Sequence, residues 1–275
     1  MIHAPLPAAQ VSDDPDLDTK QLIRMLAAGK NVITTVGYVN PRAYGQALAD
    51  RLDQACKSGG TSLHGTGFNP GFMGDALVLV LSGLARNVTS VSVRESADLF
   101  WYASPEILFD MMGMGKTREE YEVHSGRYRK WLSGLFLESV HLIADGLGRP
   151  VSDVRVDEEV AVTDKPLDIA AGHLEAGTVA AQRWRWTGST DGTDWIHLES
   201  VYRAQGDVAP DWASSGWLVE LGGEPTMKLS IPDWVSDPLM ATAMHAVNAV
   251  PAVCRAEPGI RTFLDLPLIV GRSLG

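Results

Sequence analysis

A histidine and a glycine-rich turn stand together early in the sequence, where His64 is followed by Gly65-Thr66-Gly67-Phe68-Asn69-Pro70-Gly71. Glycines let a backbone take positive φ values and approach a ligand closely, and a histidine can donate a proton to an imine or carbonyl. Backbone amides at the start of the next helix would favour an anionic or carbonyl group. The structural alternatives are that Asn69 caps a helix beginning at Pro70 and that His64 is a packing residue at a strand end.

Further along, Glu95, Tyr102 and Glu106 are polar side chains able to carry protons. Two carboxylates in one cleft can have different pKa values and act as acid and base. Glu106 in the first turn of a helix would instead only offset the helix dipole. Met111 belongs to segment 110–115, which is rich in methionine and glycine. Such a segment is typical either of an adaptable pocket wall or of a core helix that ends in a glycine cap.

Strands and helices alternate in residues 1–66. The pattern predicts a strand over Asn31–Thr35, a helix over Pro41–Ser58 and a strand over Thr61–Thr66. Strands joined by single helices pair in parallel, and ligands of open α/β sheets bind at the carboxyl ends of such strands. The elements predicted next are a helix over Met73–Leu84, a strand over Val88–Glu95, and helices over Ser104–Met111 and Ser125–Gly146.

The pattern changes near Val151 to strands with alternating polar and apolar residues. Asp191-Gly192 predicts a tight hairpin, and a last helix is expected over Pro238–Val250, ended by Pro251. The fold class is therefore α/β followed by α+β, with a parallel sheet first and a mainly antiparallel sheet second. The strands predicted for this second half are Val154–Val162, Gly177–Gly188, Trp195–Arg203, Trp217–Leu221 and Thr226–Ile231.

One predicted strand separates aromatic from charged side chains, because Trp184 and Trp186 fall on one face and Arg183 and Arg185 on the other. An aromatic face of a sheet usually packs against helices or a second subunit. We expect a homodimer or homotetramer formed through this antiparallel sheet.

Composition excludes several classes of protein. The 275 residues include 34 acidic and 23 basic side chains, a net charge of −11, which argues against a nucleic-acid partner because an acidic surface repels phosphate. No apolar stretch is long enough to span a bilayer and no signal peptide is recognisable, so a cytoplasmic protein without a membrane partner is expected. Cys56 and Cys254 lie outside zinc-binding spacings, so we expect reduced thiols and no metal site.

Four ordered segments give the sequence a family resemblance that covers essentially the whole chain: 3–7, 29–37, 65–71 and 104–112. In this order and spacing they resemble the family of dihydrodipicolinate reductase, 2,4-diaminopentanoate dehydrogenase and related amine dehydrogenases. The diaminopentanoate dehydrogenase branch is the most similar. The histidine pair and the lysine of dihydrodipicolinate reductase are missing after Arg94, which argues against the lysine-pathway reaction.

The resemblance implies a truncated Rossmann-type domain. The family begins with a strand, a G-x-G-x-x-G turn and a helix, and Met1–Ala4 matches only its fourth strand, so about 70–90 residues would normally precede it. We therefore expect this chain to bind its cofactor, NAD or NADP, weakly or not at all. The domains expected are residues 1–68 as the remaining dinucleotide-binding portion, 69–236 as a substrate and oligomerisation domain, and 237–275 as a helix and tail packing back on the first.

The resemblance also assigns the loops. The loop that includes Ala4 and Pro5 would pass near the nicotinamide ribose, and the loop Thr34–Tyr38 would lie beside the ring. Tyr38 stands where amine dehydrogenases carry a glutamate, with an aromatic packing role as the alternative. The catalytic candidates are Tyr38, His64 and Glu95; the cofactor-binding candidates are Ala4, Pro5, Thr34, Thr35, Gly37, Gly67 and Asn69; the substrate-binding candidates are Gly65, Thr66, Phe68, Tyr102 and Met111.

Two functions follow as hypotheses. The first is an NAD(P)H-dependent oxidoreductase that transfers hydride to or from the carbon of a small imine, amine or carbonyl substrate. The second is a non-catalytic binding or assembly subunit derived from such an enzyme, because the phosphate-binding turn and the usual acid and base residues are missing.

Overall fold

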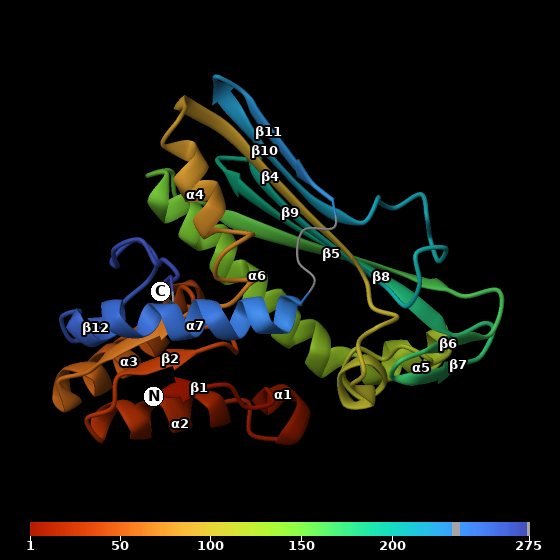
Figure 1. Cartoon of the computed structure of the whole chain (residues 1–275), viewed down its shortest axis with the longest axis horizontal. Coiled ribbons are helices and arrows are strands. Elements are labelled where there is room, and N and C mark those ends of the chain that lie inside the picture. The colour runs from red at the N-terminus through yellow and green to blue at the C-terminus, as the bar shows by residue number, and fades with distance from the viewer. Residues whose placement is uncertain (233–236, 274–275) are drawn as a thin grey trace. The chain divides into compact units, whose positions relative to one another are not determined.

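The structure, a computed structural model, describes residues 1–232 and 237–273 (Figure 1). Its contacts divide the chain into two compact units, neither of them continuous in sequence. Unit 1 contains Met1–Gly83, Gly134–Pro150 and the chain from residue 237 onward, and unit 2 contains Leu84–Ser133 and the chain from Val151 to residue 232. The predicted domain boundary at residue 236 lies outside the described residues, as do residues 274–275 of the predicted C-terminal segment.

Unit 1 is built on a four-stranded sheet in the order β1-β2-β3-β12. All of its pairs are parallel, as predicted for the early strands. The fourth strand comes from the far end of the chain and was not predicted, because its two residues carry no recognisable pattern. The strands are β1 (Ile2–His3), β2 (Val32–Thr34), β3 (Ser62–Gly65) and β12 (Gly259–Ile260).

Helices cover both faces of this sheet. Leu22 of α2 and Leu52 of α3 are completely buried with Leu63 of β3 on one face. Ala249 and Val253 of α7 pack against Ile33 of β2 on the other. The helices of unit 1 are α1 (Ala8–Val11), α2 (Leu17–Ala27), η1 (Pro41–Tyr44), α3 (Gln46–Gly59), α4 (Ala76–Ser82), the second part of α6 (Gly126–Gly146) and α7 (Pro238–Arg255).

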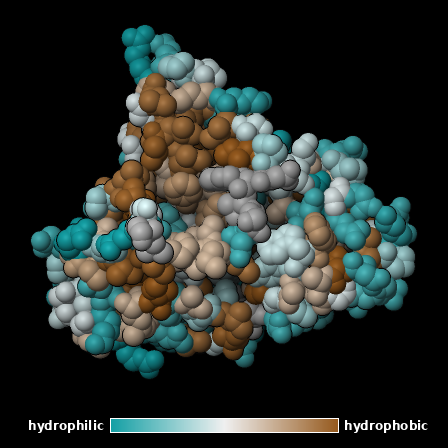
Figure 2. Space-filling view, viewed as in Figure 1, coloured by the Kyte–Doolittle hydropathy of each residue, from teal (hydrophilic) through white to brown (hydrophobic). Residues whose placement is uncertain are grey.

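Helix α7 differs from the predicted one, because Pro251 lies inside it and the helix continues to Arg255. An interior proline costs about 3 kcal/mol in an isolated helix, and the burial of Ala252 and Val253 offsets that cost here. The outer face of α7 is also apolar, with Met240, Met244 and other side chains exposed, and brown and tan atoms lie over α7 and α4 in Figure 2.

Unit 2 is built on a six-stranded sheet in the order β11-β10-β4-β9-β8-β5. It is mainly antiparallel, as predicted, with one parallel pair between β4 and β9 at its centre. A separate hairpin, β6 (Leu167–Ile169) with β7 (Gly172–Leu174), was not predicted. The strands of the large sheet are β4 (Arg86–Asp98), β5 (Asp153–Val162), β8 (Val179–Thr190), β9 (Thr193–Arg203), β10 (Gly216–Glu224) and β11 (Met227–Ile231).

The hairpin predicted from Asp191-Gly192 joins β8 to β9, and both turn residues have the positive φ values that such a turn requires. The predicted separation of faces on β8 is also confirmed. Trp184 and Trp186 are buried and stacked at 6.1 Å, and Tyr128 of α6 meets Trp184 edge-on at 5.9 Å. The aromatic face therefore packs against a helix of its own unit.

Two short helices of unit 2 depart from the predictions. The predicted helix over Ser104–Met111 is a π-helix, η2 (Glu106–Met111). Helix α5 (Arg118–His124) was not predicted, although Thr117 and Glu120 form a capping box that marks its start.

Candidate functional site at the carboxyl edge of the parallel sheet

The predicted cofactor loops leave the parallel sheet at one edge. Residue pairs His3 with Thr34, and Thr34 with Gly65, show that β1, β2 and β3 end level with one another. The amide of Thr66 donates to the carbonyl of Thr34 at 2.9 Å. The structure therefore brings together the loops that carry Ala4, Pro5, Thr35, Gly37, Tyr38, Gly67, Phe68 and Asn69.

The loop after β2 has no room for larger residues at its two glycine contacts. Gly37 has φ +100°, and a Cβ there would lie 2.8 Å from Leu135 Cδ2 and 3.1 Å from Glu138 Oε1. A Cβ on Gly65 of β3 would lie 2.2 Å from the carbonyl of Tyr38. Glycine is thus required where this loop passes between β3 and α6.

Tyr38 directs its hydroxyl to the side chain of Thr19, with 2.9 Å between the two oxygens. Burial raises the pKa of this phenol well above its ordinary value. A phenol in that position holds its proton tightly, so the geometry favours the packing role over the role of an acid.

Glu138 is a carboxylate that the sequence did not identify. It is completely buried, and its two oxygens accept from the amides of Tyr38 at 2.9 Å and Asn40 at 2.7 Å. The Tyr44 hydroxyl is a third hydrogen-bond partner. Burial raises the pKa of Glu138 to about 7 in spite of these donors. The one signal in the sequence is an acidic residue that follows the apolar run Leu135–Leu137 within a predicted helix.

Asp75 is a second buried carboxylate and holds the turn after β3. It accepts from the amides of Gly71 at 3.0 Å and Ala76 at 2.6 Å, and from the Ser139 hydroxyl at 2.8 Å. Burial raises its pKa. Asp75 is also the N-cap of α4, which corrects two predictions: the helix begins at Ala76 rather than Met73, and Asn69 does not cap it. A short carboxylate that reaches two amides of the turn outcompetes the more distant asparagine.

His64 lies at the end of β3 and is buried, with Nδ1 2.7 Å from the carbonyl oxygen of Arg261. Nδ1 must carry the proton in this bond, which leaves Nε2 as an acceptor without a partner among the described residues. Burial lowers the pKa of His64 to about 4. A neutral imidazole of this kind is a poor proton donor, so the packing role is favoured.

The turn after His64 is tied to α7. The Thr66 hydroxyl lies 2.6 Å from Nδ1 of His245, and the Phe68 amide donates to Thr242 at 3.2 Å. Within the turn, Gly71 takes a positive φ of +117°. These bonds fix the position of the predicted substrate residues Thr66 and Phe68.

Three predicted site residues belong to unit 2. Glu95 accepts from the hydroxyl of Tyr202 at 3.0 Å on the inner side of β4. Tyr102 meets Trp101 edge-on at 5.6 Å, and burial raises the pKa of its hydroxyl. Met111 is the last residue of η2. In the first turn of that helix, hydrogen bonds from its own backbone amide and from the Ser104 hydroxyl lower the pKa of Glu106, which favours the structural role.

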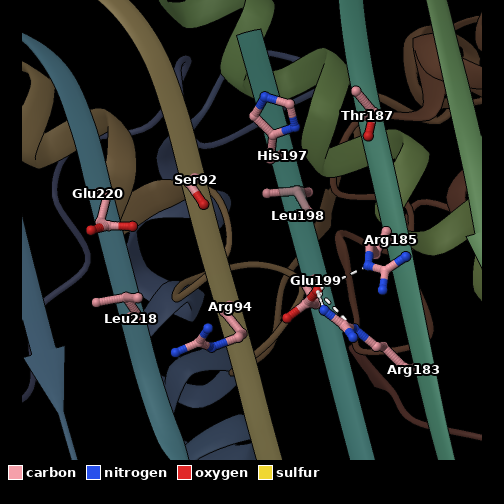
Figure 3. Close-up of a pocket in the computed structure, with 10 residues that line it drawn as sticks. All are labelled: Ser92, Arg94, Arg183, Arg185, Thr187, His197, Leu198, Glu199, Leu218 and Glu220. Atoms are coloured by element: carbon pink, nitrogen blue, oxygen red, sulfur yellow. Dashed lines mark hydrogen bonds and ion pairs between the residues drawn. The ribbon is translucent and has the colours of Figure 1, made fainter. Parts of the chain in front are cut away.

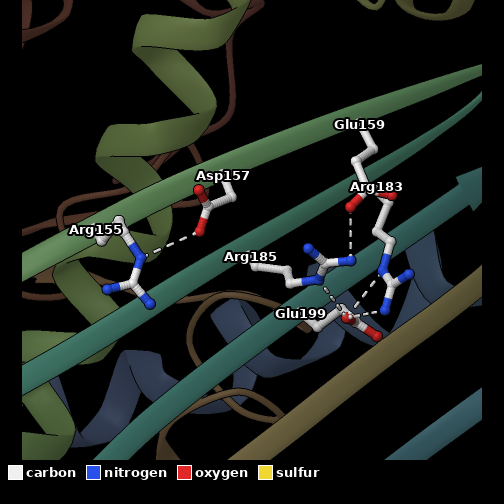
Figure 4. Close-up of polar contacts among 6 residues, drawn as sticks. All are labelled: Arg155, Asp157, Glu159, Arg183, Arg185 and Glu199. Atoms are coloured by element: carbon white, nitrogen blue, oxygen red, sulfur yellow. Dashed lines mark hydrogen bonds and ion pairs between the residues drawn. The ribbon is translucent and has the colours of Figure 1, made fainter. Parts of the chain in front are cut away.

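A hollow of about 310 Å³ lies on the sheet face opposite the tryptophans (Figure 3). It spans β4, β8, β9 and β10 and is lined mainly by charged and polar side chains, together with Leu198 and Leu218. Glu199 accepts from Arg183 at 3.0 Å and from Arg185 at 3.1 Å, and Arg185 also reaches Glu159 at 2.8 Å (Figure 4). We refer to the side of the sheet that carries these residues as the outer face.

Residues 1–232 and 237–273 contain neither a metal-binding cluster nor a membrane-spanning helix. No three His, Cys, Asp or Glu side chains there are arranged to hold a metal ion. No helix in that part of the chain is long and apolar enough to cross a membrane.

The arrangement of a parallel sheet covered by helices and a second, mainly antiparallel sheet is the fold of an amine dehydrogenase. The solved amine dehydrogenase of Mycobacterium smegmatis superposes on 99% of this chain and 76% of its own, with a TM-score of 0.74 and 22% identity. The chain belongs to the family of the 2,4-diaminopentanoate dehydrogenase C-terminal domain, whose model matches residues 72–273. The family resemblance inferred from the sequence is thereby confirmed.

Two curated relatives are similar over most of the chain. The 2,4-diaminopentanoate dehydrogenase of Acetoanaerobium sticklandii is 30% identical over 231 residues, which are 83% of this chain and 64% of that enzyme. The amine dehydrogenase of Streptomyces virginiae is 27% identical over 273 residues, 92% of this chain and 74% of its own length. The chain thus spans about two thirds of the length of the first relative.

Proposed function

We propose that this chain functions as an NAD(P)-dependent oxidoreductase of the diaminopentanoate dehydrogenase type. Its reaction is hydride transfer between the nicotinamide and the carbon of an imine, amine or carbonyl substrate, and a cytoplasmic location belongs to the same proposal. The observation that carries it is the shared carboxyl edge of β1, β2 and β3, where dinucleotide-binding sheets bind their ligands. Membership of a dehydrogenase family supports it.

The chain's own residues fit the nicotinamide side of such a cofactor. Gly37 lets the loop after β2 pack closely on α6, and the turn with Thr66 and Phe68 is fixed by bonds to α7. The cofactor, when bound, supplies the hydride chemistry. No G-x-G-x-x-G segment occurs in these 275 residues, so weak binding by this chain alone remains our prediction.

Few of the predicted residues are suited to donate or accept the proton in this reaction. Tyr38 is bonded to Thr19 and His64 to a carbonyl, and the pKa of each is shifted by burial away from neutral pH. Glu95, with the Tyr202 hydroxyl as donor, is the remaining predicted carboxylate and is our first choice for the acid or base. The substrate-binding roles of Gly65, Tyr102 and Met111 stay proposals of the same kind.

Saturation-transfer NMR of the whole chain with millimolar NADH or NADPH tests the proposal, because it detects weak binding and identifies which ligand protons touch protein. We expect transfer to the nicotinamide and its ribose to exceed transfer to the adenine. Transfer mainly to the adenine, or to no proton, would contradict the proposal. Tight binding by calorimetry would refute the predicted weakness.

Two glycines offer a matched pair of variants for this experiment. In Gly37→Ala the new methyl would meet Leu135 and Glu138, so the loop must move and nicotinamide transfer should fall at least severalfold. Gly45 has nearly the same φ, +103°, with no atom within 4 Å of a new Cβ, so Gly45→Ala imposes the same backbone strain without the clash. Equal effects of the two variants would show that the loop after β2 is not at the ligand.

A second candidate function, an assembly subunit, is supported by the outer face of the six-stranded sheet. Arg94, Arg183 and Arg185 stand there beside Glu199 and Glu220, so two copies of this face can be complementary in charge. A homodimer or homotetramer through this face is the expected assembly. Light scattering should show a dimer or tetramer that Arg94→Glu weakens, and a monomeric wild-type chain at micromolar concentration would contradict it.

A further inference from the structure

The loop Gly37–Asn40 is held by α6 through a carboxyl group that no solvent reaches. The loop packs tightly against two elements, because Gly37 faces Leu135 of α6 and Gly65 of β3 faces the carbonyl of Tyr38. The adjoining η1 is packed as closely, since a Cβ on Gly134 of α6 would lie 3.0 Å from the Tyr44 ring. Inside this packing, Glu138 receives the two loop amides at 2.9 and 2.7 Å. Moving the loop therefore breaks bonds to Glu138, and hydrating Glu138 requires moving the loop.

The partners of Glu138 in the described chain are neutral donors, and no Lys or Arg faces it. The titratable groups that do face it are Tyr38 from the loop, Tyr44 from η1 and Asp75 from the segment before α4. His141 and Asp145 lie further along the same helix, and Asp145 accepts from the side chain of Asn40 at 3.0 Å. A charged carboxylate here is buried without a cation and near a second carboxyl, which is costly.

We propose that Glu138 is a positioning residue whose neutral form holds the loop Gly37–Asn40 closed and whose ionised form favours its opening. This inference rests on the proposed function, because the loop is the one assigned to the nicotinamide ring. Glu138 is not a catalytic residue, since both oxygens are engaged by the loop and none is exposed. The loop of the cofactor site is thereby coupled to proton binding at a buried group.

The direction follows from linkage. Burial raises the pKa of Glu138 from an ordinary 4.5 to about 7 in the closed loop, whereas a hydrated Glu138 in the open loop returns toward the ordinary value. The closed loop therefore binds the additional proton, is favoured at low pH, and loses stability as the pH rises toward 7. Above about 7 both forms are ionised and the dependence ends.

Hydrogen exchange of the Tyr38 and Asn40 amides in the full chain measures this opening. After correction for intrinsic exchange rates, we expect their protection to fall between pH 5 and pH 7, by roughly tenfold per pH unit at most, and to level off above 7. Glu138→Gln stays neutral at every pH, so its protection should be independent of pH. The exposed Glu257→Gln is the matched control and should keep the wild-type profile.

A second variant keeps the test decisive if Glu138→Gln does not fold. Tyr44→Phe removes a donor that favours the ionised form, so the levelling-off point should move above that of the wild type. Protection that does not vary with pH in the wild type, or that varies equally in Glu138→Gln, would overturn the inference.

Cofactor binding is read separately. The exchange transition, present in the wild type and absent in Glu138→Gln, supports the inference whether or not NADH gives a saturation-transfer signal. Nicotinamide binding without the transition overturns the inference and leaves the proposed function standing. An exchange transition without any saturation-transfer signal from the cofactor supports the inference about Glu138 and contradicts the proposed function.

Discussion

The two units use carboxyl groups in different ways. In unit 1, Asp75 and Glu138 are fully buried and bind backbone amides, so they fix the course of loops. In unit 2, Glu199 and Glu220 lie on an open sheet face and bind arginine or lysine side chains. Removing a buried acceptor costs far more stability than removing a surface partner, because water cannot reach the buried donors to replace it. The comparison therefore predicts a steep gradient in the effects of similar substitutions.

The largest effect is expected for Asp75→Ala. It leaves two amides and the Ser139 hydroxyl without their acceptor, and should lower the free energy of unfolding by roughly 3–5 kcal/mol, since each unpaired buried donor costs about 1–3 kcal/mol. Ser139→Ala removes one donor and should cost about 1 kcal/mol. Urea denaturation followed by circular dichroism measures both. A loss below about 1 kcal/mol for Asp75→Ala would remove the distinction between the units.

How these carboxylates are used is the part of the site that the sequence could not reveal. Strand β2 was predictable because its β-branched run Val32–Thr34 is a local signal. The turn at Asp191-Gly192 was predictable because its chemistry lies in two adjacent residues. Glu138 binds amides about 100 positions earlier, and a helical pattern does not say which loop an acidic residue will meet.

The absence of long-range information from local patterns also explains the wrongly predicted helix boundaries and the unpredicted strand β12. Pro251 is a local stop signal that the packing of α7 on β2 overrides. Strand β12 pairs with β3 across nearly two hundred positions and has only two residues, too few for any periodicity. Asn69 offered a plausible local cap, but Asp75, the residue directly before the helix, supplies it.

A pH effect of intermediate size is expected from His64. Burial lowers its pKa from 6.5 to about 4 in the folded chain, so the unfolded chain binds more protons between these values. The free energy of unfolding contributed by His64 is therefore intact above pH 6.5 and decreases by roughly 3 kcal/mol as the pH falls toward 4. His64→Asn keeps a donor for the Arg261 carbonyl but not the titration. Urea curves at pH 7 and 4.5 should show a smaller loss in the variant, and equal losses would show that His64 is not buried as described.

A smaller effect is expected on the outer face from Glu199→Gln. Glu199 is only 17% exposed and joins Arg183 and Arg185, so its loss weakens two partly screened ion pairs. We expect a decrease of about 1 kcal/mol in the free energy of unfolding, partly removed by salt. A decrease as large as that of Asp75→Ala would contradict the comparison, because Glu199 would then contribute as much stability as the buried carboxylates of unit 1.

The smallest effect is expected for Lys228→Ala, which breaks the pair of Lys228 with Glu220 at 2.8 Å. Both side chains are well exposed, at 63% and 41%, and pairs of this kind contribute at most about 0.5 kcal/mol. Thermal unfolding at micromolar and tenfold higher protein concentration checks this. A larger, concentration-dependent loss would mean that the outer face is covered by a second copy in solution, because only desolvation by a partner makes such a pair matter. The difference between the carboxylates of the two units would then hold for the isolated chain but not for the assembled protein.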